Sequence, residues 1–114
     1  MADKVLIYEQ LPELRELSAV SSNRVYRKRL SAASEDLTRA YLEVVHNLVY
    51  NETLAQVLTR GEKQYIRRRR GVLAKLAKPK LPLKTKQRRL ATLGLSFLKR
   101  LIPIVDRYLV PVAT

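Results

Sequence analysis

Cysteine is absent from the sequence and histidine occurs once, which excludes several kinds of site. Without thiols the chain can form neither a disulfide framework nor a thiolate metal site. His46 alone cannot complete a metal cluster or a histidine-based triad, and we interpret it as a structural helix residue. The sequence also lacks a glycine-rich phosphate loop, and no two carboxylates are spaced as acid–base catalysis would require. We therefore expect a protein that is not an enzyme and uses no cofactor or metal.

Long hydrophobic runs are missing as well. No window of about 18 uncharged apolar residues predicts a transmembrane helix, and residues 1–10 lack the apolar stretch of a secretory signal. These absences predict an intracellular protein. A chain of 114 residues has the usual size of one domain with a modest core, so we expect residues 1–114 to form a single helical domain with loose ends.

Only three glycines and five prolines interrupt a sequence dominated by Leu, Ala, Arg, Lys and Glu, which favours helices over strands. The expected fold is all-α, a compact bundle of four or five short helices with flexible termini. The helices are expected near residues 11–20, 24–32, 34–50, 59–78 and 84–92, with a connector over residues 51–58. The third is the best candidate for the central helix, because its apolar residues follow the i, i+3, i+4, i+7 spacing. These residues are Leu37, Ala40, Tyr41, Val44, Val45 and Leu48.

Local motifs mark some of the helix ends. Ser34 is the expected N-cap of the central helix, and Thr59 with Glu62 fits a capping box. Pro103 is expected to kink the C-terminal segment or to start a new turn. In the helix predicted over residues 59–78, Arg69 interrupts an apolar stripe, so its stem should lie on the stripe while its head reaches solvent or phosphate. The stripe consists of Tyr65, Ile66, Val72, Leu73 and Leu76.

Positive charge is in large excess and is unevenly distributed. The sequence has 23 Lys and Arg residues against 10 Asp and Glu, a net charge of +13, which is typical of proteins with a polyanionic partner. Residues 60–92 carry thirteen of the basic residues and Glu62 as their only acid. We predict that this strongly basic segment binds nucleic acid. Its basic residues are Arg60, Lys63, Arg67, Arg68, Arg69, Arg70, Lys75, Lys78, Lys80, Lys84, Lys86, Arg88 and Arg89.

The partner expected for this segment is double-stranded DNA, with RNA as an alternative. Neutralising phosphates releases counterions and gives affinity that does not depend on sequence. Tyr65 is the only aromatic residue in the segment, which argues against stacking on single-stranded bases. A nuclear import signal without further role, or a merely solvated surface, would explain the same charges. A secondary basic patch should add to the site if the fold brings it close; it consists of Arg24, Arg27, Lys28 and Arg29.

The C-terminal segment, residues 93–114, is more apolar than a surface helix requires. It could pack in the core or in an oligomer, dock another protein such as a capsid component, or lie in a membrane interface. A protein- or membrane-interaction module working through this amphipathic segment is therefore the alternative function, and an RNA- or ribosome-associated protein is a third. The candidate contact residues are Phe97, Leu98, Leu101, Ile102, Val105 and Tyr108.

Several short motifs resemble a known group of proteins. They include Leu14-Arg15-x-Leu17, His46-Asn47-Leu48, Tyr65-Ile66-Arg67, Phe97-Leu98 and Leu101-Ile102-Pro103. From Leu11 onward the chain resembles small basic proteins of Maverick/Polinton elements and adintoviruses, which are similar to the small adenovirus core protein called X or mu.

The resemblance implies a DNA-condensing core or minor structural protein of a virion, located in the virion and the host nucleus. It implies phosphate contacts by residues 67–70 and 84–89, and a C-terminal segment that docks to capsid or membrane. Such proteins often have a Gly-Gly-Phe-Leu maturation junction, where this chain has Gly94-Leu95-Ser96-Phe97-Leu98.

Overall fold

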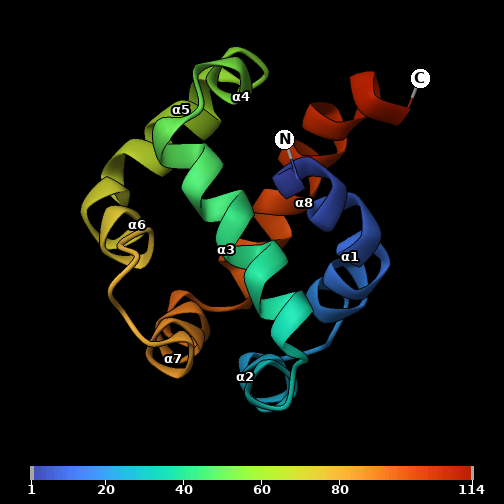
Figure 1. Ribbon diagram of the computed structural model, residues 1–114, viewed down its shortest axis with the longest axis vertical. Helices are drawn as coiled ribbons and strands as arrows, with labels where there is room; N and C mark the ends of the chain where they lie inside the picture. The colour runs from blue at the N-terminus through green and yellow to red at the C-terminus, as the bar shows by residue number, and fades with distance from the viewer. Residues whose placement is uncertain (1, 114) are drawn as a thin grey trace.

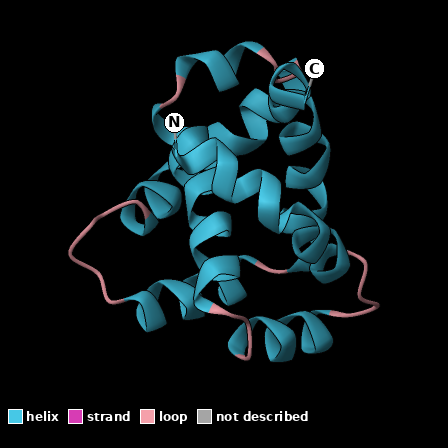
Figure 2. Ribbon diagram, turned by 45° about the vertical axis from the view of Figure 1, so that its right-hand side comes forward, coloured by secondary structure: helices cyan, strands magenta, loops and turns pink. Residues whose placement is uncertain are grey.

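The computed structural model describes residues 2–113, and the side chains of residues 4–109. Within this range every regular element is a helix, which confirms the predicted all-α class (Figure 2). The predicted count of four or five was too low, because the described residues form eight helices. These are α1 (Ala2–Ser18), α2 (Asn23–Ser31), α3 (Glu35–Tyr50), α4 (Glu52–Gln56), α5 (Arg60–Arg68), α6 (Arg70–Leu76), α7 (Leu83–Leu93) and α8 (Leu95–Ala113).

Helix α3 lies at the centre, with α1, α6 and α7 packed around it (Figure 1). It begins after the predicted N-cap, where the Ser34 hydroxyl accepts a hydrogen bond from the amide of Leu37 at 3.1 Å. All six apolar residues predicted for its inner face are buried. The 3.6-residue spacing therefore identified the central helix and its orientation correctly.

Helix α1 begins much earlier than the sequence predicted. The first helix was predicted over residues 11–20, but α1 runs from Ala2 through Pro12 to Ser18. Ile7, Leu14 and Leu17 lie on its buried side, with Ile7 0% exposed. The first turns therefore form because they contribute to the core against α3 and α8. The flexible ends predicted from the sequence fall partly on Met1 and Thr114, which lie outside the described residues.

The predicted connector over residues 51–58 contains a short helix, α4. The Asn51 side-chain oxygen accepts hydrogen bonds from the amides of Thr53 and Leu54 at 2.9 and 3.2 Å, which caps the helix. Leu54 is only 2% exposed and anchors α4 in the core. The Thr59–Glu62 capping box is confirmed, with both of its hydrogen bonds formed.

The helix predicted over residues 59–78 is broken at Arg69 into α5 and α6. The amide of Arg69 donates to the carbonyl of Ile66 at 3.0 Å. This bond joins residues three positions apart, so the turn is tighter than a turn of α-helix. This turn changes which residues face inward. Ile66, Leu73 and Leu76 are buried as predicted, whereas Val72 is 50% exposed and does not belong to the stripe.

Helices α7 and α8 are joined at Gly94, whose φ of 90° is a conformation that favours glycine. Helix α8 then continues through Pro103, so no new helix begins there. It packs against α1 and α7. The Tyr108 hydroxyl of α8 accepts a hydrogen bond from the Asn51 side chain at 2.9 Å, which links α8 to the end of α3.

Candidate nucleic-acid interface

Helices α2 and α7 are far apart in the sequence but lie side by side in the fold (Figure 1). Two hydrogen bonds between these helices, and a third from α2 to the first residue of α8, set their register. The amide of Leu95 donates to the Asn23 side chain at 2.7 Å, and the Tyr26 hydroxyl donates to the Leu90 carbonyl at 2.8 Å. At the other end, the Gln87 amide group donates to the Leu30 carbonyl at 2.7 Å. Because later residues of α2 meet earlier residues of α7, the two helices are antiparallel.

The contact between the two helices rests on a pair of buried tyrosines. Tyr26 and Tyr41 are both 0% exposed, and their hydroxyl oxygens are 2.9 Å apart. Since the Tyr26 hydroxyl donates to Leu90, Tyr41 is the donor to Tyr26. Burial raises the pKa of Tyr26 to about 12 and the pKa of Tyr41 well above its usual value. Both therefore remain neutral at physiological pH and hold α2, α3 and α7 together.

A shallow hollow of about 280 Å³ runs between α2 and α7, lined by Ser31, Lys84, Gln87, Arg88 and Ala91. Lys84 and Arg88 are one turn apart and exposed.

Helix α2 carries two further cations in line with Ser31, although they do not line the hollow themselves. Arg24 and Arg27 precede Ser31 by seven and four residues, so the three share one face of α2. Both arginines are exposed. The four cations Arg24, Arg27, Lys84 and Arg88 are called here the α2–α7 basic face.

No acidic residue occurs in α2 or α7. Among residues 4–109, the salt bridges join Arg15 to Asp106, Arg39 to Glu35 and Arg107 to Glu62, and none involves a cation of these two helices. The α2–α7 basic face is therefore a surface of uncompensated positive charge on two helices held in fixed register.

The remaining cations of α2 and α7 do not all join this face. Lys28 and Arg89 are exposed on the same two helices. Lys86 is half-buried and lines a different hollow, beside Glu43 and Arg39. The fold therefore separates Lys86 from the residues with which the sequence grouped it.

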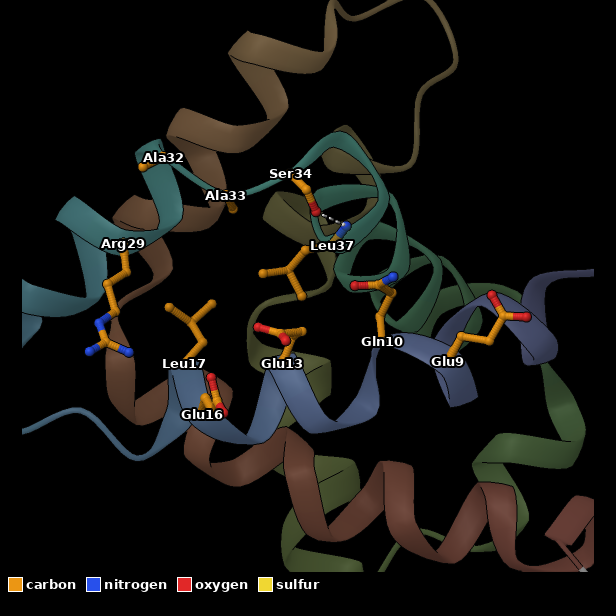
Figure 3. A pocket seen from close by; sticks show the side chains of 10 residues that line it. All are labelled: Glu9, Gln10, Glu13, Glu16, Leu17, Arg29, Ala32, Ala33, Ser34 and Leu37. Carbon is orange, nitrogen blue, oxygen red and sulfur yellow. Dashed lines mark hydrogen bonds between the residues drawn. The ribbon is translucent and has the colours of Figure 1, made fainter.

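Arg29 also points elsewhere, toward the acidic side of α1. It lines a hollow of about 620 Å³ together with Glu9, Glu13 and Glu16, as Figure 3 shows. Leu17 of α1 and Leu37 of α3 form apolar parts of its wall. The predicted secondary patch is thus divided, with Arg24 and Arg27 on the basic face and Arg29 beside the acidic helix.

The run of four arginines lies on α5 and α6, where its members face different ways. Arg69 lies against Tyr65, with its guanidinium carbon 3.6 Å from the ring centroid and one NH group 3.1 Å from the Tyr65 carbonyl. Its head therefore contacts an aromatic ring of the preceding helix, α5. Arg67, Arg68 and Arg70 are exposed. Other exposed cations of the basic segment are Arg60, Lys63, Lys75, Lys78 and Lys80.

Arg100 of α8 was not among the predicted site residues, yet it lies 4.5 Å from the centroid of the same Tyr65 ring. The guanidinium carbons of Arg69 and Arg100 therefore lie within about 8 Å of each other, because their separation cannot exceed the sum of their two distances to the ring centroid. No local sequence motif indicates this contact, because α5 and α8 are distant along the chain.

The C-terminal residues predicted as candidates for contact with a partner or membrane lie mainly in the core. Five of the six are buried in the core and Ile102 is half-buried against it. The buried five are Phe97, Leu98, Leu101, Val105 and Tyr108. In this fold they offer no surface to a second molecule, so the core-packing alternative describes them. Among the described residues, no helix combines the length and apolar character needed to cross a membrane.

Comparisons of the chain with protein-family models, with curated proteins and with solved structures give no significant match. The resemblance seen in the sequence motifs stays a prediction.

Proposed function

We propose that this protein binds duplex DNA through phosphate contacts, without sequence preference and without catalysing a reaction, and that the α2–α7 basic face is its principal contact surface. The observation that carries the proposal is the pairing of two acid-free basic helices whose hydrogen-bonded contacts join residues 57 and 64 positions apart. Four exposed cations on the paired helices, of which Lys84 and Arg88 line the hollow between them, provide the multiple phosphate contacts on which counterion release depends.

The same geometry favours the phosphate backbone over the bases. Tyr26 is the only aromatic residue of α2 and α7, and it is 0% exposed, so the face offers no platform for base stacking. Lys28, Arg89 and the connector residues Lys78 and Lys80 would extend the contact along the duplex. A DNA-condensing role in a virion and a nuclear location are the finer form of this proposal, and they rest on the resemblance described above.

Binding to unrelated duplexes across a salt series tests the proposal. The variant Arg27→Gln with Arg88→Gln should weaken binding and make the dependence of log affinity on log salt shallower by about 2, at roughly 0.9 per phosphate contact. The control, Arg39→Gln with Lys99→Gln, removes the same charge from exposed positions on α3 and α8. It should leave the slope close to that of the wild type.

Two results would contradict this assignment. Equal losses in the test and control variants would show diffuse attraction by net charge. A tenfold preference for one duplex sequence, about 1.4 kcal/mol, would show base recognition instead of backbone binding. An RNA duplex used as competitor at the same salt distinguishes DNA binding from the RNA alternative.

A further inference from the structure

Another hollow, of about 300 Å³, lies where the end of α3 meets α4 and α5. It is close to the lower limit of the volumes typical of small-molecule sites. Its lining falls into two chemically distinct groups. Five residues are apolar: Leu48, Val49, Ala55, Leu58 and Ile66. The other three are the cations Lys63, Arg67 and Arg70, and no acidic residue contributes to the lining.

The local structure of α5 explains why these cations gather. Lys63 and Arg67 are one turn apart on the same face of α5. Arg70 comes three residues later, after the tight turn at Arg69, and lines the same hollow. Their neighbour Arg68 does not line it, although it is also exposed. The arrangement therefore depends on position along the helix and not only on local charge.

The end of α3 does not balance this charge. A helix C-terminus carries about half a negative charge, and one of its last carbonyls, that of Asn47, already accepts a hydrogen bond from the Asn51 amide at 2.9 Å. Three full positive charges converge on the hollow. The greater part of their charge is left for a ligand or for solvent.

The floor of the hollow is aliphatic. Leu48 and Ile66 are 8% and 6% exposed, and they form its deeper part. No aromatic side chain lines the hollow, so it suits a flexible alkyl chain better than a planar base. We propose that this hollow binds an amphiphilic anion, with a short acyl or alkyl chain on the aliphatic floor and a phosphate or carboxylate head held by Lys63, Arg67 and Arg70.

This site is separate from the α2–α7 basic face and does not depend on the proposed DNA binding. A duplex phosphate has no alkyl chain to occupy the floor, so the floor distinguishes the two kinds of ligand. Loss of DNA binding with retained amphiphile binding would refute only the proposed function. The reverse result would refute only this inference.

Titration of the full-length protein with decyl phosphate, kept below its micelle concentration, tests the site. Calorimetry should show one bound molecule, and amide shifts should concentrate at the hollow. Arg67→Gln should weaken binding about tenfold, the effect of one charge-assisted hydrogen bond. Arg68→Gln removes the same charge from the adjacent position and should weaken binding less than about twofold. Ala55→Phe, at an exposed position, should fill the hollow and abolish binding.

Two further ligands separate the contributions of head and chain. The affinities of decanoate and decyl phosphate show whether a carboxylate or a phosphate head is preferred. Binding of inorganic phosphate measures the contribution of the head alone. Equal weakening by the two arginine variants would overturn the proposal. Unchanged binding to Ala55→Phe, or displacement of decyl phosphate by equimolar inorganic phosphate, would do so as well. A urea midpoint near that of the wild type confirms that each variant is folded.

Discussion

The hydroxyl groups of Tyr26 and Tyr41 lie in the core and connect α2, α3 and α7 through a chain of hydrogen bonds ending at the Leu90 carbonyl. That carbonyl belongs to the last turn of α7, where the Gly94 amide donates to Ala91 at 3.3 Å. Because the Gly94 amide donates to Ala91, it is not available to the Leu90 carbonyl in the usual α-helical pattern. The Tyr26 hydroxyl supplies a donor to this carbonyl at the end of α7. The position of α7, and with it the α2–α7 basic face, depends on these two residues.

Removing either hydroxyl should therefore destabilise the fold, but unequally. Tyr26→Phe removes the donor to Leu90 and the acceptor for Tyr41, so we expect the free energy of unfolding to fall by about 2–3 kcal/mol. Tyr41→Phe leaves the bond from Tyr26 to Leu90 intact and should cost about 1 kcal/mol. Urea unfolding of the two variants and the wild type measures the difference. Equal losses would contradict the assigned direction of the hydrogen bonds.

The same tyrosines should make stability depend on alkaline pH. The pKa of Tyr26 is about 12 in the folded protein against 10.0 for an ordinary tyrosine, and that of Tyr41 is also raised. Above pH 10 the unfolded chain loses these protons first, so the free energy of unfolding falls as pH rises toward 12. Below pH 10 this contribution is fully present. We expect a decline of about 1.4 kcal/mol per pH unit for each tyrosine within the window.

Urea unfolding at several pH values above about 9 measures this decline. Lysines deprotonate in the same range, so the Tyr26→Phe variant serves as the control that isolates the tyrosine contribution. Its stability should decline less steeply than that of the wild type. Identical pH profiles would contradict the raised pKa of Tyr26.

At the scale of the elements, the turn between α7 and α8 depends on Gly94. Its φ of 90° is unfavourable for residues with a Cβ, and an added Cβ would lie 3.4 Å from the Asn23 side-chain oxygen that accepts the Leu95 amide. Gly94→Ala should destabilise the protein by about 1–3 kcal/mol. Thermal unfolding should show a lower Tm.

The other two glycines provide matched controls. Gly61 and Gly71 lie within α5 and α6, and nothing lies within 4 Å of a Cβ added at either position. Gly61→Ala and Gly71→Ala should each raise stability by up to about 1 kcal/mol, since alanine favours helix. A stabilising effect of Gly94→Ala would show that this turn is not strained.

The elements that could be predicted from the sequence are those with complete local signals. Helix α3 has an N-cap, a regular apolar face and a clear end, and the capping box at Thr59 is equally local. Helix α4 was missed because its five residues are too few to show a period. The break at Arg69 was missed because no proline marks it and Gly71, two residues later, lies inside α6, and the position of Val72 was consequently wrong. The start of α1 was predicted too late, near residue 11, because a proline such as Pro12 is typical of the first turn of a helix.

At the scale of the whole molecule, the charge of each segment followed from composition, but its grouping in space did not. Arg24 and Arg27 join Lys84 and Arg88 only because Tyr26 and Gln87 pair α2 with α7 across 57 and 64 residues, while Asn23 bonds to the first residue of α8. Arg29 sits beside the acidic residues of α1 because it lies on another face of α2. Such long-range pairing depends on tertiary packing, which helical periodicity alone does not determine.

The excess charge of the whole molecule should make salt act in opposite directions on folding and on DNA binding. A net charge of +13 confined within about 30 Å repels itself, and the Debye length falls from about 10 Å at 0.1 M salt to about 3 Å at 1 M. The urea midpoint should therefore rise with NaCl, because salt screens this repulsion. Salt also screens the ion pairs, but these are mostly exposed and contribute little to stability. DNA affinity should fall over the same range. The Arg27→Gln and Arg88→Gln variant, with two fewer charges, should gain less stability from salt than the wild type. A urea midpoint that falls with salt would instead show that the ion pairs Arg15–Asp106 and Arg107–Glu62 outweigh the repulsion.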